Sequence, residues 1–143
     1  MKSKAPLALM EQMVMVLIFA LAAALCLQAF ALSDRMSRGS ELRDGAVILA
    51  QNAAEVCKAG GGDWELLEQM LGGEAIQNGW SAFCGESLEA VTAAEDAAYE
   101  VVVQPEAEDV PGLGRATVSV FVAEGELLFR LPVAWQKEAA GNG

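Results

Sequence analysis

The sequence predicts an α+β protein in which one long N-terminal helix packs on a small antiparallel β-sheet. Two observations predict this class. From Met13 to Leu32 the chain has 20 residues without a charge, long enough for a helix to span a bilayer. From Tyr99 onward, apolar and polar side chains alternate with a period of two, which is typical of half-buried strands. We therefore expect four segments: a basic leader (1–6), an apolar helix (7–32), one folded domain (33–136) and a polar tail (137–143).

The helix is predicted to continue beyond the apolar run. Between Ser33 and Lys58, small and apolar residues recur at three- and four-residue spacing, which gives one narrow stripe suited to packing on a sheet. Gly39 and Gly45 weaken the helix, so we expect a bend or a frayed turn between Arg38 and Asp44. The stripe consists of Leu42, Ala46, Leu49, Ala50, Ala53 and Cys57.

Glycines mark the end of this helix and the limits of the next one. The triplet at residues 60–62 ends the long helix, and Gly60 is expected to be its left-handed cap. Asp63 is predicted to cap a short helix over Trp64–Leu71, which Gly72-Gly73 ends. We expect its apolar face to fold back onto the long helix.

The C-terminal part is predicted to form strands. Tyr99–Gln104 alternates, a loop with a Pro111-Gly112 turn follows, and Thr117–Ala123 and Glu126–Trp135 form a hairpin through a two-residue Glu124-Gly125 turn. Pro132 predicts that the last strand is an edge or is bulged there. Before these strands, residues 86–97 read as a loop or a partial helix. Predicted buried residues are Trp80, Phe83 and Cys84, and, on the last strand, Leu127, Phe129, Leu131, Val133 and Trp135.

Charge and composition exclude several functions. The net charge is −11, and residues 59–143 carry 15 acidic and 3 basic side chains, so this part repels phosphate backbones and no nucleic acid partner is expected. The chain has no histidine, no nucleophile motif and no metal-ligand spacing. We therefore expect no enzyme, no cofactor and no metal. Glu106, Glu108 and Asp109 cluster in a loop, where solvated charge is favoured over a loose calcium site.

Three cysteines are present. Cys26 lies inside the apolar run and is read as a small hydrophobic residue. Cys57 and Cys84 flank the short helix and would close a disulfide around it in an oxidising compartment. Two unrelated free thiols remain the alternative.

The N-terminus allows three interpretations. A secretory signal peptide is indicated by Lys2 and Lys4, followed by an apolar stretch and an Ala29-Phe30-Ala31 cleavage site. A plain single-span anchor is the second interpretation. The third starts from one charge: Glu11 stands at the beginning of the apolar run, where an unpaired carboxylate is costly and marks a candidate functional site.

The third interpretation rests on a family resemblance. The basic leader, then Leu7-Ala8-Leu9-Met10-Glu11 and one long hydrophobic helix resemble the N-terminus of type IV pilins and type II secretion pseudopilins. Aligned in this way, Glu11 occupies the family's fifth mature position. The implied prepilin-peptidase site lies at Ala5, Pro6 and Leu7, where Pro6 and Leu7 replace the family's usual glycine or alanine and phenylalanine.

The resemblance implies a structural role. It implies a minor pilin or pseudopilin whose Glu11 pairs with the freed amine of a neighbouring subunit and sets the register of a filament. The alternative for Glu11 is a carboxylate that reaches back to head-group water. The implied partners are other subunits, prepilin peptidase, the inner-membrane assembly machinery and the lipid bilayer.

The resemblance also implies a location. The N-terminus would be cytoplasmic and processed, with methylation, and the domain over residues 33–136 would be extracytoplasmic in a bacterial or archaeal envelope. The alternative function is a single-span anchored or secreted acidic binding domain with no filament role.

Overall fold

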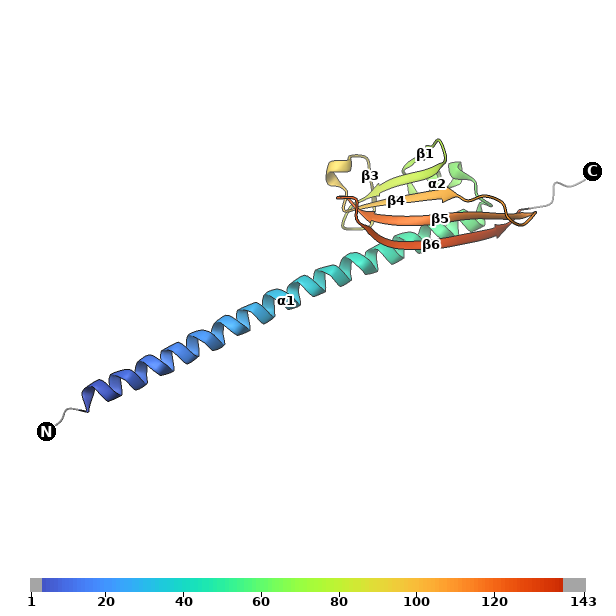
Figure 1. The fold of residues 1–143 in the computed structure, drawn as a ribbon. Helices are drawn as coiled ribbons and strands as arrows, with labels where there is room; N and C mark the ends of the chain where they lie inside the picture. Colours follow the sequence, from blue (N-terminus) through green and yellow to red (C-terminus); the bar gives the residue numbers. More distant parts are fainter. Residues whose placement is uncertain (1–3, 138–143) are drawn as a thin grey trace, which may run out of the picture. The chain divides into compact units, whose positions relative to one another are not determined.

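The structure is a computed structural model that describes residues 4–137, and it confirms the predicted α+β class (Figure 1). Two compact units divide the chain between Ser40 and Glu41, and helix α1 contributes to both. The elements are α1 (Ala5–Ala59), α2 (Trp64–Leu71), β1 (Glu74–Ile76), β2 (Gly79–Cys84), β3 (Ala90–Val91), a 3-10 turn η1 (Ala94–Asp96), β4 (Tyr99–Pro105), β5 (Leu113–Val122) and β6 (Leu127–Gln136).

All strand pairs in the described residues are antiparallel. The order is β1-β2-β4-β5-β6, and β3 pairs with β2 beside β1. Strand β6 is therefore an edge, as Pro132 predicted, because proline cannot donate to a further strand. The bulge lies elsewhere on the same strand: opposite Val120 and Phe121 of β5 the register shifts, and Leu128 is the extra residue of β6.

The core of the second unit lies between the last turns of α1 and one face of the sheet. The predicted stripe is confirmed: Ala46, Ala50 and Cys57 have no exposed surface, and Leu42 packs at its margin. Small side chains on the helix allow its backbone to approach the sheet closely. The sheet contributes large fully buried side chains to this core, namely Trp80, Val101, Val103, Val118 and Val120.

Gly45 lies inside α1 where the helix packs against Tyr99. The helix is continuous from Ala5 to Ala59, so the predicted frayed turn between Arg38 and Asp44 is not formed. Gly45 is buried, and a Cβ atom there would contact the Tyr99 hydroxyl and lie 3.0 Å from Tyr99 Cζ. The residue is small because the Tyr99 side chain, which extends from β4, occupies the space that a Cβ atom would need.

The end of α1 corrects one prediction and confirms another. Gly61 and Gly62 have positive φ values of 62° and 85°, whereas Gly60 does not, so the predicted left-handed cap at Gly60 is wrong by one residue. The Gly60 N–H still donates to Val56 O, which keeps Gly60 within the helical hydrogen-bond pattern. Asp63 caps α2 as predicted, since its Oδ1 accepts from Glu65 N at 3.0 Å.

The segment before Tyr99 forms three strands that the sequence did not indicate, namely β1, β2 and β3. Trp80 and Cys84 are buried as predicted, and Trp80 Nε1 donates to Gly72 O at 3.0 Å. Phe83 is only half-buried, because alternation along β2 places it on the opposite face of the sheet. Residues 86–97 contain the short strand β3 and the turn η1.

Both the first strand of the hairpin and its turn are longer than predicted. Strand β5 begins at Leu113 and ends at Val122, and four residues, Ala123–Glu126, connect it to β6. The Val122 N–H donates to Glu126 O at 2.8 Å, and Gly125 supplies the positive φ of 92°. The predicted two-residue turn is therefore wrong. The preceding Pro111-Gly112 turn is present, with Leu113 N donating to Val110 O.

Strand β6 buries only part of its predicted apolar face. Val133 and Trp135 are buried, while Phe129 and Leu131 are half-buried against the core. Leu127 is 42% exposed, because it directly follows the hairpin turn and pairs with Phe121 beyond the register shift.

Candidate functional site

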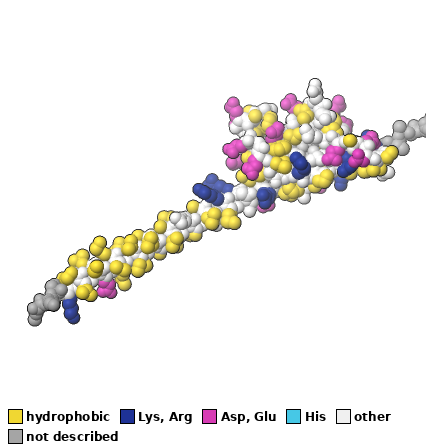
Figure 2. Space-filling model, in the orientation of Figure 1, with side chains coloured by type: hydrophobic (Ala, Val, Ile, Leu, Met, Phe, Trp, Pro, Cys, Tyr) yellow, Lys and Arg dark blue, Asp and Glu magenta, His cyan; other side chains and the backbone are white. Residues whose placement is uncertain are grey.

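The first unit of the structure is an exposed apolar helix. Every described residue from 4 to 40 is exposed, including Leu7 and Phe19 at 77% each. Figure 2 shows hydrophobic side chains covering this part of α1. It is the one helix in residues 4–137 that is long and apolar enough to cross a membrane. An apolar surface of this size marks a contact with lipid or with other chains.

Glu11 is a lone charge at the beginning of this surface. Its neighbours one turn away are the aliphatic residues Leu7, Ala8, Val14 and Met15. No ion pair in the described chain involves Glu11. Taking an unpaired carboxylate out of water is unfavourable, so an apolar environment would demand a cationic partner here.

The predicted processing site lies in the first turn of the same helix. Ala5, Pro6 and Leu7 are its first three residues, and Ala8 N donates to Lys4 O at 3.3 Å. Proline is tolerated in a first turn because the N–H it lacks has no helical acceptor there. The rest of the leader, residues 1–3, lies outside the described residues. Cleavage at this site stays a prediction.

Cys57 and Cys84 are free thiols in the structure, not the disulfide that the sequence also allowed. Cys84 lines a cavity of about 50 Å³ with Leu49 and Ala53, one to two turns before Cys57 on α1, and Cys57 does not line it. Burial raises the pKa of Cys57 to about 11 and also raises the pKa of Cys84. Both thiols are therefore kept protonated and act as small core residues.

The acidic loop between β4 and β5 is held by basic side chains. Arg115 lies 3.5 Å from Glu106 and 2.9 Å from Asp109, and Lys137 lies 3.0 Å from Glu108. No group of three or more acidic or sulfur ligands that could hold a metal occurs in residues 4–137. These carboxylates therefore fasten the loop to β5 and to the end of β6. Beyond Lys137, the predicted tail lies outside the described residues.

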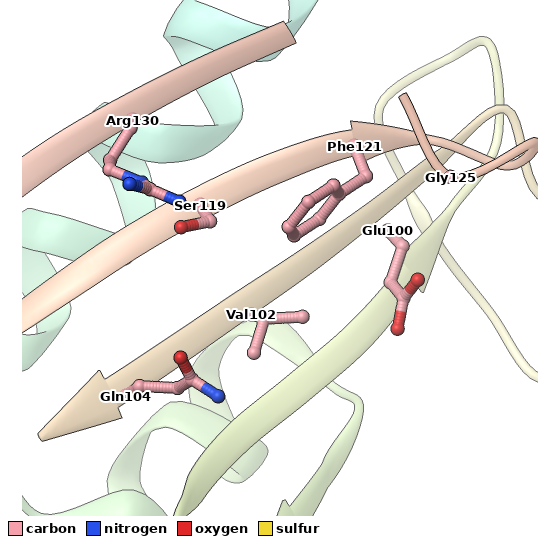
Figure 3. Close-up of a pocket in the computed structure, with 7 residues that line it drawn as sticks. All are labelled: Glu100, Val102, Gln104, Ser119, Phe121, Gly125 and Arg130. Atoms are coloured by element: carbon pink, nitrogen blue, oxygen red, sulfur yellow. The ribbon is translucent and has the colours of Figure 1, made fainter. Parts of the chain in front are cut away.

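A second surface feature lies on the sheet face opposite α1. It is a hollow with a volume of about 370 Å³. Figure 3 shows its lining residues, with Arg130 beside Ser119 at one end and Glu100 beside Phe121 at the other. Cross-strand register builds it, because Ser119 pairs with Arg130 on one side and with Val102 on the other. Arg130 has no ion pair in the described chain, so its guanidinium is free to bind a carboxylate from another molecule. Sequence reasoning missed this hollow, since it depends on strand register.

The sequence placed Tyr99 in a strand but did not predict its contact with α1. Its side chain is 4% exposed and reaches α1 at Gly45. Burial, and then the nearby carboxylates of Glu86 and Glu41, raise the pKa of Tyr99. The neutral phenol is therefore favoured in this contact.

Comparison with known proteins gives no relative from which a function can be taken. No family model matches the chain, and no curated protein and no solved structure matches it significantly. The function must therefore be argued from the exposed helix, Glu11 and the sheet domain themselves.

Proposed function

We propose that this chain is a structural subunit of an envelope filament, resembling a minor pilin or a pseudopilin, which assembles through the first unit of α1. The observation that carries the proposal is Glu11, a carboxylate without a partner at the start of a fully exposed apolar helix. A helix of this kind is stable in a bilayer or against other apolar helices, and its charge then needs an opposite charge from outside the chain.

The second unit supports this role as a compact domain outside the membrane. The apolar stripe of α1 from Leu42 to Cys57 is packed against its own sheet, so these side chains do not compete for lipid. Its strongly acidic surface disfavours contact with anionic head groups. In the proposal, the N-terminus is cytoplasmic, the domain faces outward in a bacterial or archaeal envelope, and its partners are other subunits, a prepilin peptidase, the assembly machinery and the bilayer. The proposal assigns no catalytic role.

The test is incorporation of Glu11 variants into filaments sheared from the native cell. Glu11→Gln keeps the size of the side chain and removes its charge, so we expect a loss of incorporation on the order of tenfold, as for a close charge pair. Glu55→Gln is the matched control, because Glu55 is exposed on the same helix but lies in the second unit. Normal incorporation of Glu11→Gln would refute the registry role.

The N-terminal residue of the isolated protein separates the remaining interpretations. A start at Pro6 or Leu7 supports pilin-type processing. A start near Leu32 means that the apolar run is a discarded signal peptide, which contradicts the proposal. Retention of Met1 leaves an unprocessed subunit, in which Glu11 needs a different cation.

A membrane-anchored or secreted acidic binding domain is the alternative function. The hollow of Figure 3 favours it, because Arg130 and Glu100 offer opposite charges at its two ends. An anchored binding domain would be indifferent to Glu11→Gln and sensitive to Arg130→Gln. The filament role predicts the reverse for incorporation.

A further inference from the structure

Arg130 is the only basic side chain in residues 59–137 without an ion pair to another described residue. Residues 59–143 carry three basic side chains, and two of them, Arg115 and Lys137, bind the carboxylates of the acidic loop. Arg130 instead lines the hollow of Figure 3, where it is exposed. A planar guanidinium matches the geometry of a carboxylate and binds it through two parallel hydrogen bonds.

Ser119 places a second donor beside Arg130. It is 8% exposed, pairs with Arg130 across β5 and β6, and lines the same hollow. Its hydroxyl makes no hydrogen bond with any residue that the structure describes. Buried polar groups are nearly always hydrogen-bonded, so a hydroxyl left free here is available to a ligand in the hollow. Arg130 and Ser119 together form an anion-binding end.

Glu100 forms the opposite end of the hollow. It is half-buried and has no ion pair in the described chain, so it favours a cation from outside. It lies two strands from Arg130 and two residues further along, which separates their Cα atoms by about 12 Å. Phe121 pairs with Glu100 and Val102 pairs with Ser119, so the hollow is apolar between its charged ends.

The charge of the whole chain restricts the ligand. The acidic excess of residues 59–143 repels a ligand with a net negative charge, so a carboxylate ligand must also carry a positive group. A peptide with free ends carries both charges, and an extended tripeptide spans about 10 Å between them. The volume of about 370 Å³ lies at the lower end of the range for small-molecule sites.

We propose that this hollow binds a short extended peptide by its two free ends. Arg130 and Ser119 donate hydrogen bonds to its C-terminal carboxylate, and Glu100 accepts from its N-terminal ammonium. The middle of the peptide contacts Val102 and Phe121. The site does not depend on the filament role proposed for Glu11, and it names the ligand class for the alternative of a binding domain.

The test is calorimetric titration of the full chain, in a neutral detergent, with the tripeptide alanyl-valyl-alanine. Its C-terminal amide and its N-acetyl form each remove one charge and leave the protein unchanged. We expect saturable binding of the free tripeptide at millimolar concentration or below, and an affinity on the order of tenfold lower for each modified form. No saturable binding of the free tripeptide at millimolar concentration, or equal affinity for either modified form, would overturn the proposal.

Variants assign each end of the peptide to its residue. Arg130→Gln is expected to lower the affinity for the free tripeptide on the order of tenfold and to leave that for the amide unchanged, and Ser119→Ala is expected to act in the same direction. Glu100→Gln should weaken the free tripeptide and spare the N-acetyl form. Arg43→Gln is the matched control, because Arg43 is exposed on α1 in the same unit and does not line the hollow. An equal loss from Arg43→Gln, or a further loss when Arg130→Gln and amidation are combined, would refute this assignment.

Discussion

Replacing Gly45 with alanine perturbs the contact between α1 and the Tyr99 side chain of β4. The new Cβ would contact the Tyr99 hydroxyl and would lie 3.0 Å from Tyr99 Cζ and 3.1 Å from Leu88 Cδ2. Carbon atoms pack favourably at about 3.5–4.0 Å, so neighbouring side chains must move. Overpacking of a core costs about 1–3 kcal/mol, whereas glycine to alanine in a helix gains up to about 1 kcal/mol. We expect a net loss of up to about 2 kcal/mol in the free energy of unfolding.

The control is the other glycine in the same helix. A Cβ at Gly39 would meet nothing within 4 Å, so Gly39→Ala is expected to be neutral or to stabilise the protein by up to about 1 kcal/mol. The two substitutions are chemically identical and differ only in what surrounds them. A difference in sign between them would therefore report the packing of Tyr99.

Urea unfolding of the full chain in detergent, followed by tryptophan fluorescence, measures the effect. Trp64, Trp80 and Trp135 all lie in the second unit, so the signal reports the domain that contains the contact. Tyr99→Phe removes the hydroxyl and is expected to reduce the cost of Gly45→Ala in a double-mutant cycle. Equal stabilisation by Gly45→Ala and Gly39→Ala would refute the reasoning.

Two further predictions concern the charges and thiols of the domain. Because burial raises the pKa of Cys57 to about 11, the native state keeps a proton that the unfolded chain loses near pH 9. The free energy of unfolding should therefore fall by about 2–3 kcal/mol between about pH 9 and 11, and urea titrations of Cys57→Ala should show a flatter pH dependence. Arg115→Gln removes the exposed pairs to Glu106 and Asp109, so global stability should fall by about 1 kcal/mol or less. Amide exchange in residues 106–112 should quicken, and millimolar calcium should not restore protection if these carboxylates only fasten the loop.

The sequence predicted most of the fold where its signals are local. The apolar stripe from Leu42 to Cys57 and the Asp63 cap depend on residues a few positions apart, and both are confirmed. The left-handed cap was misplaced, because a run of glycines does not show where the last helical hydrogen bond falls. Strand β2 was not predicted, since Phe83 on its outer face is as apolar as the residues on its inner face.

In the candidate sites too, the sequence revealed the local features and missed those that depend on long-range contacts. Glu11 was visible in the sequence because one charge interrupts an apolar run. The contact between Gly45 and Tyr99 was not, since the two residues meet only when β4 has been placed in the sheet. The hollow around Arg130 likewise requires the register that sets Ser119 beside it. Periodicity predicts which face of a strand is buried, but it does not predict which residues of other elements lie next to that strand.

Helix α1 meets two different burial requirements with two different compositions. From Glu41 onward its inward positions are small, and the sheet of the same chain covers them completely at Ala46, Ala50 and Cys57. From Ala5 to Ser40 it also carries many large apolar side chains, and nothing in the described chain covers them. Small residues allow close packing against one fixed partner, whereas a uniformly apolar surface does not select one axial position among many. In the proposed filament the charge of Glu11 would supply that selection, because only a register that brings a cation to it avoids a buried unpaired carboxylate.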